Sequence, residues 1–417
     1  MSQKKVLLIT YYFPPLGGAG IARPLALFQN LPLHKYECHI LTVKSVLYRA
    51  YEPELLQELD SSKIFRSGSR DPSRLLYLLG MCHIGAKAAD DSRDISRKFF
   101  PDAKAGWIKL AIRMGKKLVK SNNYDLIMST SPPISAHVIA QELAQASGIP
   151  WVADFRDFWT SYKAERYFFD SDAKKQKAKQ LLDEIKSFAN SIVAVNESVA
   201  RYVGAKSVVT NCYDSNLAKQ WKKPQLKHRF TIGVFGTISN LTPIEPLLMV
   251  LQTVKKSRPE IYSHIRVFQV GQVDSKWLKQ KVKDFGLEDI FDIREFQTRA
   301  KAIELLSEAA LFYVGVSPEQ GFGLTTNRIF TLLSSGRPIL AYTVSGSEFD
   351  LIISHSVNSF RFDDSNTAEA GRYLSQTAQK YFNGDLSIDV EPSSVREFSS
   401  DRMVEKFVTL FNRAIDE

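Results

Sequence analysis

The sequence predicts an α/β protein made of two domains, each built around a parallel sheet. Strand-like apolar runs alternate with helical patterns along the chain, which is typical of parallel α/β architecture. The 417 residues exceed what one hydrophobic core usually supports. The first strand-like run also ends in a glycine-rich loop that opens a helix, and α/β proteins bind ligands at such strand ends.

The N-terminal segment carries the clearest local pattern. Val6–Thr10 is apolar or β-branched throughout and predicts a buried parallel strand. The loop Tyr11–Gly20 follows, with Pro-Pro and Gly-Gly pairs, and the next residues place apolar side chains on one helical face. Glycines let a backbone approach a ligand, and a helix start offers unpaired N–H groups to an anion. The loop matches neither the P-loop nor the dinucleotide fingerprint, so by itself it identifies no ligand.

The remainder of the first half repeats this alternation. Its further predicted strands are Cys38–Val43, Asp125–Ser129, Pro150–Asp154, Ser191–Val195 and Ser207–Thr210. Helical patterns run from Trp107 to Lys120 and from Ser135 to Ala146.

The second half has the same organisation. Its predicted strands are Phe230–Phe235, Ile265–Val270, Ile290–Arg294, Leu311–Val316 and Pro338–Tyr342, with helices near residues 243–257, 275–284, 299–309 and 326–335. The polar stretch Asp214–His228 is the predicted linker between the halves. A last helix, Ser399–Ile415, has one apolar face and no strand after it, so it is expected to pack on structure already formed.

Composition restricts the class of protein. With 44% apolar and 24% charged residues, a folded globular chain is expected. Three cysteines without disulfide or metal-ligand spacing predict a cytoplasmic protein with no metal site. The net charge of +10 favours anionic partners, but no nucleic-acid-binding motif accompanies it, so nucleic acid is not an expected partner.

A series of motifs resembles glycosyltransferase family 4, whose members are retaining enzymes with the GT-B fold. The motifs of the first half are Tyr11–Gly20, Ser131–His137, Trp151–Trp159 and Asn211–Asp214. Those of the second half are Gly233–Thr237, Val270–Gly271, Gln320–Leu324 and Gly336–Ala341. Each motif is loose, but together they follow the order of the family over nearly the whole chain.

The resemblance implies two Rossmann-like domains that face each other across a cleft. Residues 1–212 would bind the acceptor and residues 213–396 a nucleotide-sugar donor, while helix 397–417 crosses back to the first domain. The implied reaction is metal-independent, retaining transfer of a sugar from a nucleotide-diphosphate sugar, without a cofactor. The acceptor would be a carbohydrate or a lipid-linked glycan in surface polysaccharide or glycan synthesis.

Breaking a sugar–phosphate bond develops negative charge on the departing diphosphate, which fixed donors can stabilise. Arg328, at the start of a predicted helix, is the expected phosphate clamp; the alternative is a helix-face residue without a ligand. The predicted donor-binding residues are Gly17, Gly18, Gly20, Gly236, Thr237, Gly271, Glu319, Gln320, Gly321, Phe322, Gly323, Leu324 and Asn327.

Asp154, Arg156 and Asp157 are the other predicted catalytic residues. All three follow a buried strand within an apolar stretch, where charges are costly unless they pair or bind something. We expect one carboxylate to orient Arg156 and the other to reach an acceptor hydroxyl. The alternative is an internal Arg–Asp pair that shapes a turn.

The sequence departs from the family at the donor site. Most members carry two glutamates eight positions apart. Here Gln320 stands just before Gly321, alignment from Gly336 instead puts Thr331 at the second glutamate, and Glu319 would have Asn327 at the same spacing, so no register restores both carboxylates. The usual cations after the first donor-domain strand are also missing, so Arg328 and Arg337 would have to compensate. Two alternatives therefore stay open, a catalytically inactive GT-B scaffold protein and a GT-B nucleotide-sugar epimerase.

A final expectation concerns the inner face of a membrane. The apolar run Leu75–Leu79 is close in sequence to the basic helix Trp107–Lys120, and such a surface can lie on anionic lipid. Core packing of the apolar residues beneath a solvated basic face is the alternative.

Overall fold

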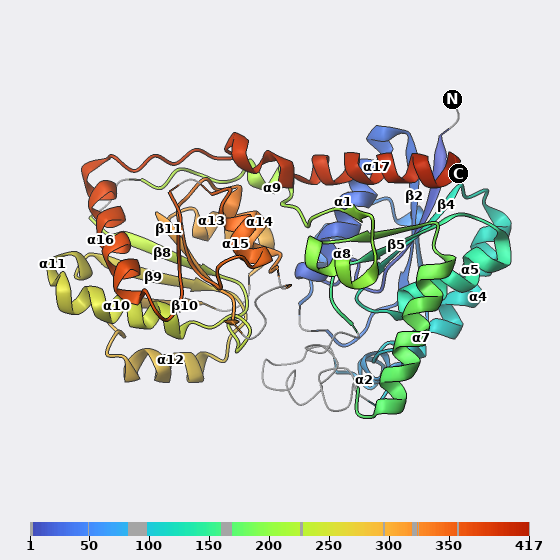
Figure 1. The fold of residues 1–417 in the computed structure, drawn as a ribbon, viewed down its shortest axis with the longest axis horizontal. Coiled ribbons are helices and arrows are strands. Elements are labelled where there is room, and N and C mark those ends of the chain that lie inside the picture. Colours follow the sequence, from blue (N-terminus) through green and yellow to red (C-terminus); the bar gives the residue numbers. More distant parts are fainter. Residues whose placement is uncertain are drawn as a thin grey trace. The chain divides into compact units, whose positions relative to one another are not determined.

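The computed structural model describes residues 3–48, 50–81, 98–159, 169–225, 228–294, 297–318, 323, 325–356 and 358–416. The chain divides into two compact units (Figure 1). Unit 1 comprises Met1–Cys212 and Ser400–Glu417, and unit 2 comprises Tyr213–Ser399.

The described part of unit 1 contains a seven-stranded sheet of order β3-β2-β1-β4-β5-β6-β7, in which every pairing is parallel. Its strands are β1 (Lys4–Ile9), β2 (Tyr36–Val43), β3 (Ile64–Ser67), β4 (Leu126–Ser131), β5 (Trp151–Phe155), β6 (Ser191–Ala194) and β7 (Ser207–Val208). The central strands are buried on both faces, as their continuous apolar runs predict.

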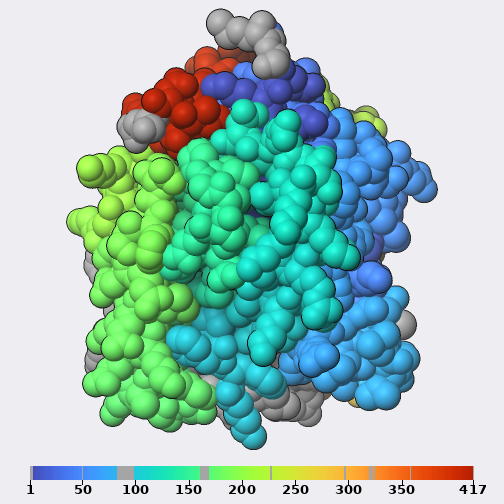
Figure 2. Space-filling view, turned by 90° about the vertical axis from the view of Figure 1, so that its right-hand side faces the viewer, coloured from blue at the N-terminus to red at the C-terminus, as the bar shows by residue number. Residues whose placement is uncertain are grey.

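Helices cover both faces of this sheet. Helices α1 (Ala22–Asn30) and α17 (Ser400–Asp416) pack together on one face (Figure 1). Helices α4 (Ala105–Ser121), α5 (Ser135–Ser147) and α7 (Asp172–Phe188) cover the other face and lie side by side, as Figure 2 shows from the right-hand side of Figure 1. Shorter helices are η1 (Ala19–Ile21), η2 (Leu31–His34), η3 (Pro53–Glu58), η4 (Ser61–Lys63), α2 (Pro72–Leu78) and α8 (Glu197–Val203).

The last helix returns to the first unit, as the fold prediction required. Met403, Phe407 and Phe411 are buried on one face of α17 and belong to the core of unit 1. Because these side chains recur at helical spacing, the helix buries an apolar stripe against α1 and the sheet.

The described part of unit 2 contains a six-stranded parallel sheet of order β10-β9-β8-β11-β12-β13. Its strands are β8 (Phe230–Phe235), β9 (Ile265–Val270), β10 (Phe291–Arg294), β11 (Leu311–Gly315), β12 (Ile339–Tyr342) and β13 (Phe360–Phe362). Its helices are α9 (Ser215–Ala218), α10 (Glu245–Ser257), α11 (Pro259–Tyr262), α12 (Ser275–Asp284), α13 (Arg299–Leu306), α14 (Arg328–Leu333), α15 (Glu348–Ile353), α16 (Thr367–Asn383) and η6 (Ser393–Phe398).

Two apolar clusters sandwich the sheet of unit 2. One is formed with α10, α11, α12 and α16, and the other with α13, α14 and α15. Neighbouring strand residues face opposite clusters: Leu311 and Tyr313 join the first, Phe312 and Val314 the second. This alternation is the period-two geometry of a strand covered on both faces.

Two edge strands and the linker differ from the sequence prediction. The edge strands β3 and β13 were not predicted, because each is short and carries an arginine within its apolar residues. The stretch predicted as a linker, Asp214–His228, is in its described part packed on unit 2. Trp221 is buried there, and its indole N–H donates to Ser334 Oγ at 3.1 Å. Among the described residues, no helix is both long and apolar enough to span a bilayer.

Candidate functional site

The loops that the sequence analysis singled out in unit 1 follow neighbouring strands. Strands β1, β4 and β5 are adjacent and parallel, so the segments after Ile9, Ser131 and Phe155 emerge at the same edge of the sheet. This carboxyl edge is where α/β sheets bind ligands.

Arg156 joins two of these loops. Its Nε donates to the Ser131 carbonyl at 2.9 Å and its Nη1 to the Gly20 carbonyl at 3.0 Å. Its side chain is 9% exposed, and burial lowers the pKa of the guanidinium. No carboxylate of the described residues forms an ion pair with Arg156, so the expected Arg–Asp pair is not found. Carbonyl oxygens orient this arginine instead.

Asp154 pairs with an arginine that the sequence analysis missed. The Arg23 Nε donates to Asp154 Oδ2 at 2.9 Å and its Nη2 to Oδ1 at 2.7 Å, which is a bidentate pair. Thr130 Oγ1 adds a third hydrogen bond to this carboxylate at 2.7 Å. Because Asp154 is fully buried, this geometry favours a structural role over contact with an acceptor hydroxyl. The only sequence signal for Arg23 was a charge at the start of the apolar helix α1.

Asp157 has the properties of an accessible acid–base group. Its side chain is exposed, whereas desolvation raises the pKa of its carboxyl to about 6 and Arg156 opposes this shift. A carboxyl that titrates in this range can exchange a proton near neutral pH. Of the two predicted catalytic carboxylates, Asp157 is exposed and Asp154 is fully buried.

The glycine loop after β1 is held from within unit 1. The Gly17 amide donates to the Ala50 carbonyl at 2.8 Å, and the Gly18 amide donates to Glu52 Oε1 at 3.2 Å. A Cβ on Gly17 would lie 2.6 Å from the same carboxylate oxygen. The two amides expected to face donor phosphates thus have protein acceptors, and Glu52 was not anticipated. Nothing in the local sequence couples it to the loop.

Three predicted donor-site residues come together in unit 2. Gly236 follows β8 with a φ of 92°, and Gly271 follows β9 with a φ of 147°. A Cβ on Gly271 would collide with the Gly236 carbonyl, and one on Gly236 would lie 3.2 Å from Arg328 Nη1. Arg328 Nη1 itself donates to the Phe235 carbonyl at 2.6 Å. Glycine is required where these strand ends touch.

The charge of Arg328 is not matched by an ion pair within the described residues. Burial lowers the pKa of its guanidinium to about 10. Nearby in the chain, the Thr326 hydroxyl is buried with no hydrogen-bond partner among the residues that the structure describes, as is the Gln269 side-chain oxygen on β9. Buried polar groups normally have partners, so this edge of the sheet has unused hydrogen-bonding capacity.

The remaining predicted residues are less informative. Thr237 is exposed after β8, Gly323 is half-buried, and Asn327 immediately precedes α14. Five predicted positions lie outside the described residues: Glu319, Gln320, Gly321, Phe322 and Leu324.

Arg337 belongs to the interior of unit 2. It is fully buried, and its guanidinium donates to the carbonyls of Ala309, Ser307 and Lys222. The guanidinium also stacks on Trp221, 5.1 Å from the ring centroid. It is therefore unavailable to compensate for missing donor-site cations.

No cluster of three or more potential metal ligands occurs among the residues described.

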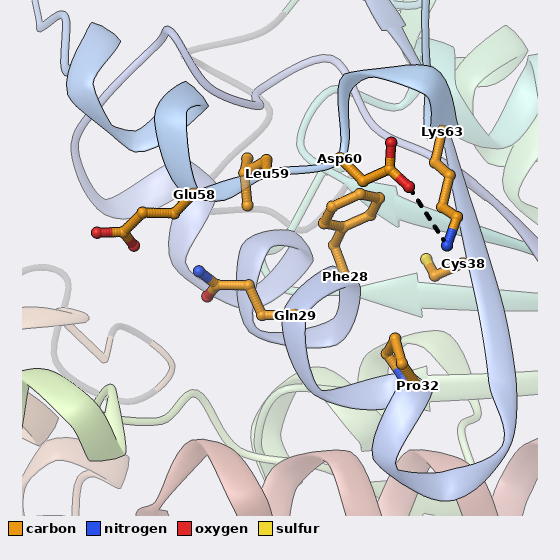
Figure 3. Close-up of a pocket in the computed structure, with 8 residues that line it drawn as sticks. All are labelled: Phe28, Gln29, Pro32, Cys38, Glu58, Leu59, Asp60 and Lys63. Carbon is orange, nitrogen blue, oxygen red and sulfur yellow. Dashed lines mark ion pairs between the residues drawn. The ribbon is translucent and has the colours of Figure 1, made fainter.

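A pocket of about 180 Å³ lies in unit 1 between the end of α1 and the start of β2 (Figure 3). Cys38 and Phe28 line it, and Lys63 pairs with Asp60 at its rim at 3.5 Å. Because Cys38 is near the amino end of β2, this pocket is not part of the strand-end site.

Comparison with known proteins gives structural matches only. No protein-family model and no curated protein matches the sequence. Sucrose-phosphate synthase from Thermosynechococcus elongatus superposes with a TM-score of 0.67 at 12% identity, covering 99% of both chains. The catalytic domain of starch synthase IV from Arabidopsis thaliana, solved with ADP and acarbose, gives 0.60 at 12% identity over 100% of both. A putative UDP-N-acetylglucosamine 2-epimerase from Listeria monocytogenes gives 0.56 at 9% identity, covering 100% of this chain and 97% of the other.

The chain has the GT-B fold. The two parallel-sheet units and the returning α17 confirm the fold class predicted from the sequence. Within this GT-B chain, the strand-end clusters around Arg156 and Arg328 occupy the carboxyl edges of the two sheets, one in each unit.

Proposed function

We propose that this GT-B protein is a glycosyltransferase that moves a sugar from a nucleotide-diphosphate sugar to a carbohydrate or lipid-linked acceptor. Unit 2 binds the donor and unit 1 binds the acceptor. The observation that carries the proposal is the convergence of Gly236, Gly271 and Arg328 at adjacent strand ends. A guanidinium without a carboxylate partner among the described residues, beside backbone that only glycine permits, suits the diphosphate of a nucleotide.

Transfer would proceed with retention and without a metal or cofactor. Arg328 stabilises the negative charge that develops on the leaving diphosphate, and Asp157 accepts a hydrogen bond from the acceptor hydroxyl and so orients it. The biological role would be glycan or surface polysaccharide synthesis in the cytoplasm, at the inner face of the membrane where the acceptor is lipid-linked.

Calorimetry with UDP, GDP and ADP in turn tests the donor site. We expect one nucleotide to bind and the matching nucleotide sugar to release free diphosphonucleoside only when an acceptor is present. The anomeric configuration of the product, read by NMR, checks retention, and activity in a chelator checks metal independence. Failure of all three nucleotides to bind would refute the proposal.

Two other functions each have a specific observation in their favour. The epimerase fold match supports a GT-B nucleotide-sugar epimerase, which would convert one nucleotide sugar into its epimer without any acceptor and without net release of nucleotide. The missing glutamate pair and the engaged Gly17 and Gly18 amides support an inactive scaffold, which would bind nucleotide sugar without transfer.

Membrane association is a separate part of the proposal. The apolar face of α4, with Trp107 and Ala111, is buried in unit 1, while its opposite face exposes Lys109, Arg113 and Lys117. The Leu75–Leu79 run, by contrast, has several leucines exposed. Lys117→Glu should reduce sedimentation of the protein with anionic vesicles. Unchanged sedimentation would show that α4 is not part of a membrane-binding surface.

A further inference from the structure

Three basic side chains form a row along the carboxyl edge of the unit 1 sheet, next to the loops around Arg156. The first is Arg66 on β3. Its guanidinium donates to the carbonyl of Val43 at 3.3 Å and to that of Pro14. It therefore contacts the last residue of β2 and the segment that follows β1.

The other two members of the row are Arg74, on α2, and Lys104, immediately before α4. Arg74 donates to the carbonyl of Ser45, and the Lys104 ammonium donates to the hydroxyl of Ser73. The Leu47 amide donates to the Ser73 carbonyl at 2.8 Å, so the segments that carry these contacts are directly joined. Consecutive contacts thus connect the whole row along one edge.

None of the three cations has a carboxylate partner at ion-pair distance among the described residues. The acidic side chains of this edge are bonded to neutral donors instead. Asp71 accepts from the Tyr11 hydroxyl at 2.9 Å, and Asp102 accepts from the Ser135 amide and hydroxyl at 2.8 Å each. The carboxylates and the cations both tether loops of this edge. They do so through separate hydrogen bonds and not through ion pairs with each other.

Burial makes this arrangement costly for the cations. Desolvation lowers the pKa of Arg66 and that of Lys104, although Asp71 and Asp102 act in the opposite direction on Lys104. An ammonium has three N–H donors and a guanidinium has five. Lys104 donates one hydrogen bond to Ser73 and lies 5.0 Å from the Tyr11 ring centroid. Arg74 donates one to Ser45 and lies 5.5 Å from the Tyr77 ring centroid, so each cation keeps further N–H donors for a ligand. An anion would offset the desolvation cost.

We propose that Arg66, Arg74 and Lys104 form a subsite for a phosphate group carried by the acceptor. The inference rests on the proposed function, because it assigns the chemical class of the acceptor that unit 1 would bind. A phosphate ester fits better than a neutral sugar, since its oxygens can accept from several cationic donors at once. The phosphate belongs either to a soluble sugar phosphate or to a lipid carrier. Leu75, Leu76 and Leu79 are exposed directly after Arg74, so a lipid carrier has an apolar surface beside the subsite.

The test uses glucose 6-phosphate as the soluble probe and glucose as its neutral counterpart. A saturating nucleoside diphosphate is present throughout, so that the probe does not report on unit 2. We expect glucose 6-phosphate to bind and glucose to bind far more weakly. Lys104→Met should weaken binding about tenfold or more, because a charge-assisted hydrogen bond is lost. Lys104→Arg should retain binding.

Lys109→Met is the matched control, since Lys109 is an exposed cation on the adjoining helix α4. It should leave binding unchanged, and an equal loss in Lys109→Met would overturn the subsite in favour of unspecific charge attraction. Arg74→Gln provides an independent variant, and circular dichroism confirms that each variant is folded. If Lys104→Met does not fold, Arg74→Gln alone decides, and undiminished binding in it overturns the proposal.

The lipid arm uses phosphatidylcholine vesicles with and without a polyprenyl phosphate. Binding only to the phosphate-bearing vesicles, reduced in Lys104→Met, supports a lipid-carried phosphate; binding of glucose 6-phosphate supports a soluble one. If the nucleoside diphosphate binds but neither phosphate probe does, the subsite is refuted while the proposed function survives. If no nucleoside diphosphate binds, the proposed function fails whatever the phosphate probes show.

Discussion

Asp154→Asn is the substitution that most directly tests the structural interpretation of unit 1. Asparagine keeps the shape of the side chain and removes its charge. Arg23 is then left 1% exposed without a carboxylate partner. The asparagine has one side-chain oxygen, whereas the carboxylate accepts three hydrogen bonds, two from Arg23 and one from Thr130.

The expected loss of stability is large. Removing one partner of a buried ion pair typically costs about 3–5 kcal/mol, because the remaining charge stays desolvated. For a unit of this size, such a loss lowers the melting temperature by roughly 10 °C. The effect should also loosen α17, since Arg23 lies 4.8 Å from the Phe407 ring centroid and donates to the Thr210 carbonyl at 2.9 Å.

Urea unfolding and hydrogen exchange of α17 measure this effect. Asp157→Asn is the matched control, because it removes an exposed carboxylate three positions away and should not reduce stability. The double variant Arg23→Met/Asp154→Leu should regain most of the loss, because no unpaired charge remains. If Asp154→Asn is as stable as the parent yet abolishes transfer, Asp154 is catalytic and the structural interpretation is wrong.

Three further outcomes follow from the site geometry. Arg328→Ala should weaken binding of a nucleoside diphosphate at least tenfold while sparing the nucleoside, as a lost charged hydrogen bond implies; equal losses in calorimetry would contradict a phosphate clamp. Gly271→Ala should abolish nucleotide binding because its Cβ meets the Gly236 carbonyl, whereas Gly286→Ala, at a φ of 64° with open space around it, should bind normally. Transfer should rise with pH through about 6 as Asp157 loses its proton, and Asp157→Asn should remove that titration from the rate profile. Since this folded pKa is raised above the usual carboxyl value, Asp157 favours folding at low pH, and that contribution is lost as pH rises toward 6.

Most of the fold was predictable because each central strand is a continuous apolar run that can be recognised from its own residues. Phe230–Phe235 and Ile265–Val270 are continuous apolar runs, and both have the predicted bounds. The short edge strands β3 and β13 carry no such run, and their pairing depends on neighbours elsewhere in the chain. Pattern reasoning therefore identifies buried strands more readily than edge strands.

The site was predictable only as far as its residues are neighbours in sequence. Strand-end glycines such as Gly236 and Gly271 could be located from the runs before them. The partner of Asp154 could not, because Arg23 is 131 positions away. Glu52 accepts a hydrogen bond from the Gly18 amide although the two residues are 34 positions apart in sequence, so this contact could not be predicted either. A charged residue within an apolar stretch of sequence indicates that its side chain needs a hydrogen-bond or ion-pair partner. Which residue is that partner depends on the fold.

These long-range hydrogen bonds change which groups are expected to stabilise the leaving diphosphate in the proposed reaction. With the Gly17 and Gly18 amides bonded to Ala50 and Glu52, unit 1 has a carboxylate beside its glycine loop, and these two amides already have acceptors. A diphosphate is repelled by such a carboxylate. In the proposed reaction, stabilisation of the leaving group is therefore expected to depend chiefly on Arg328, whose guanidinium donates only to the Phe235 carbonyl among the described residues and has donors left. This explains why a chain without the usual glutamate pair and cations can still be expected to depend on one arginine.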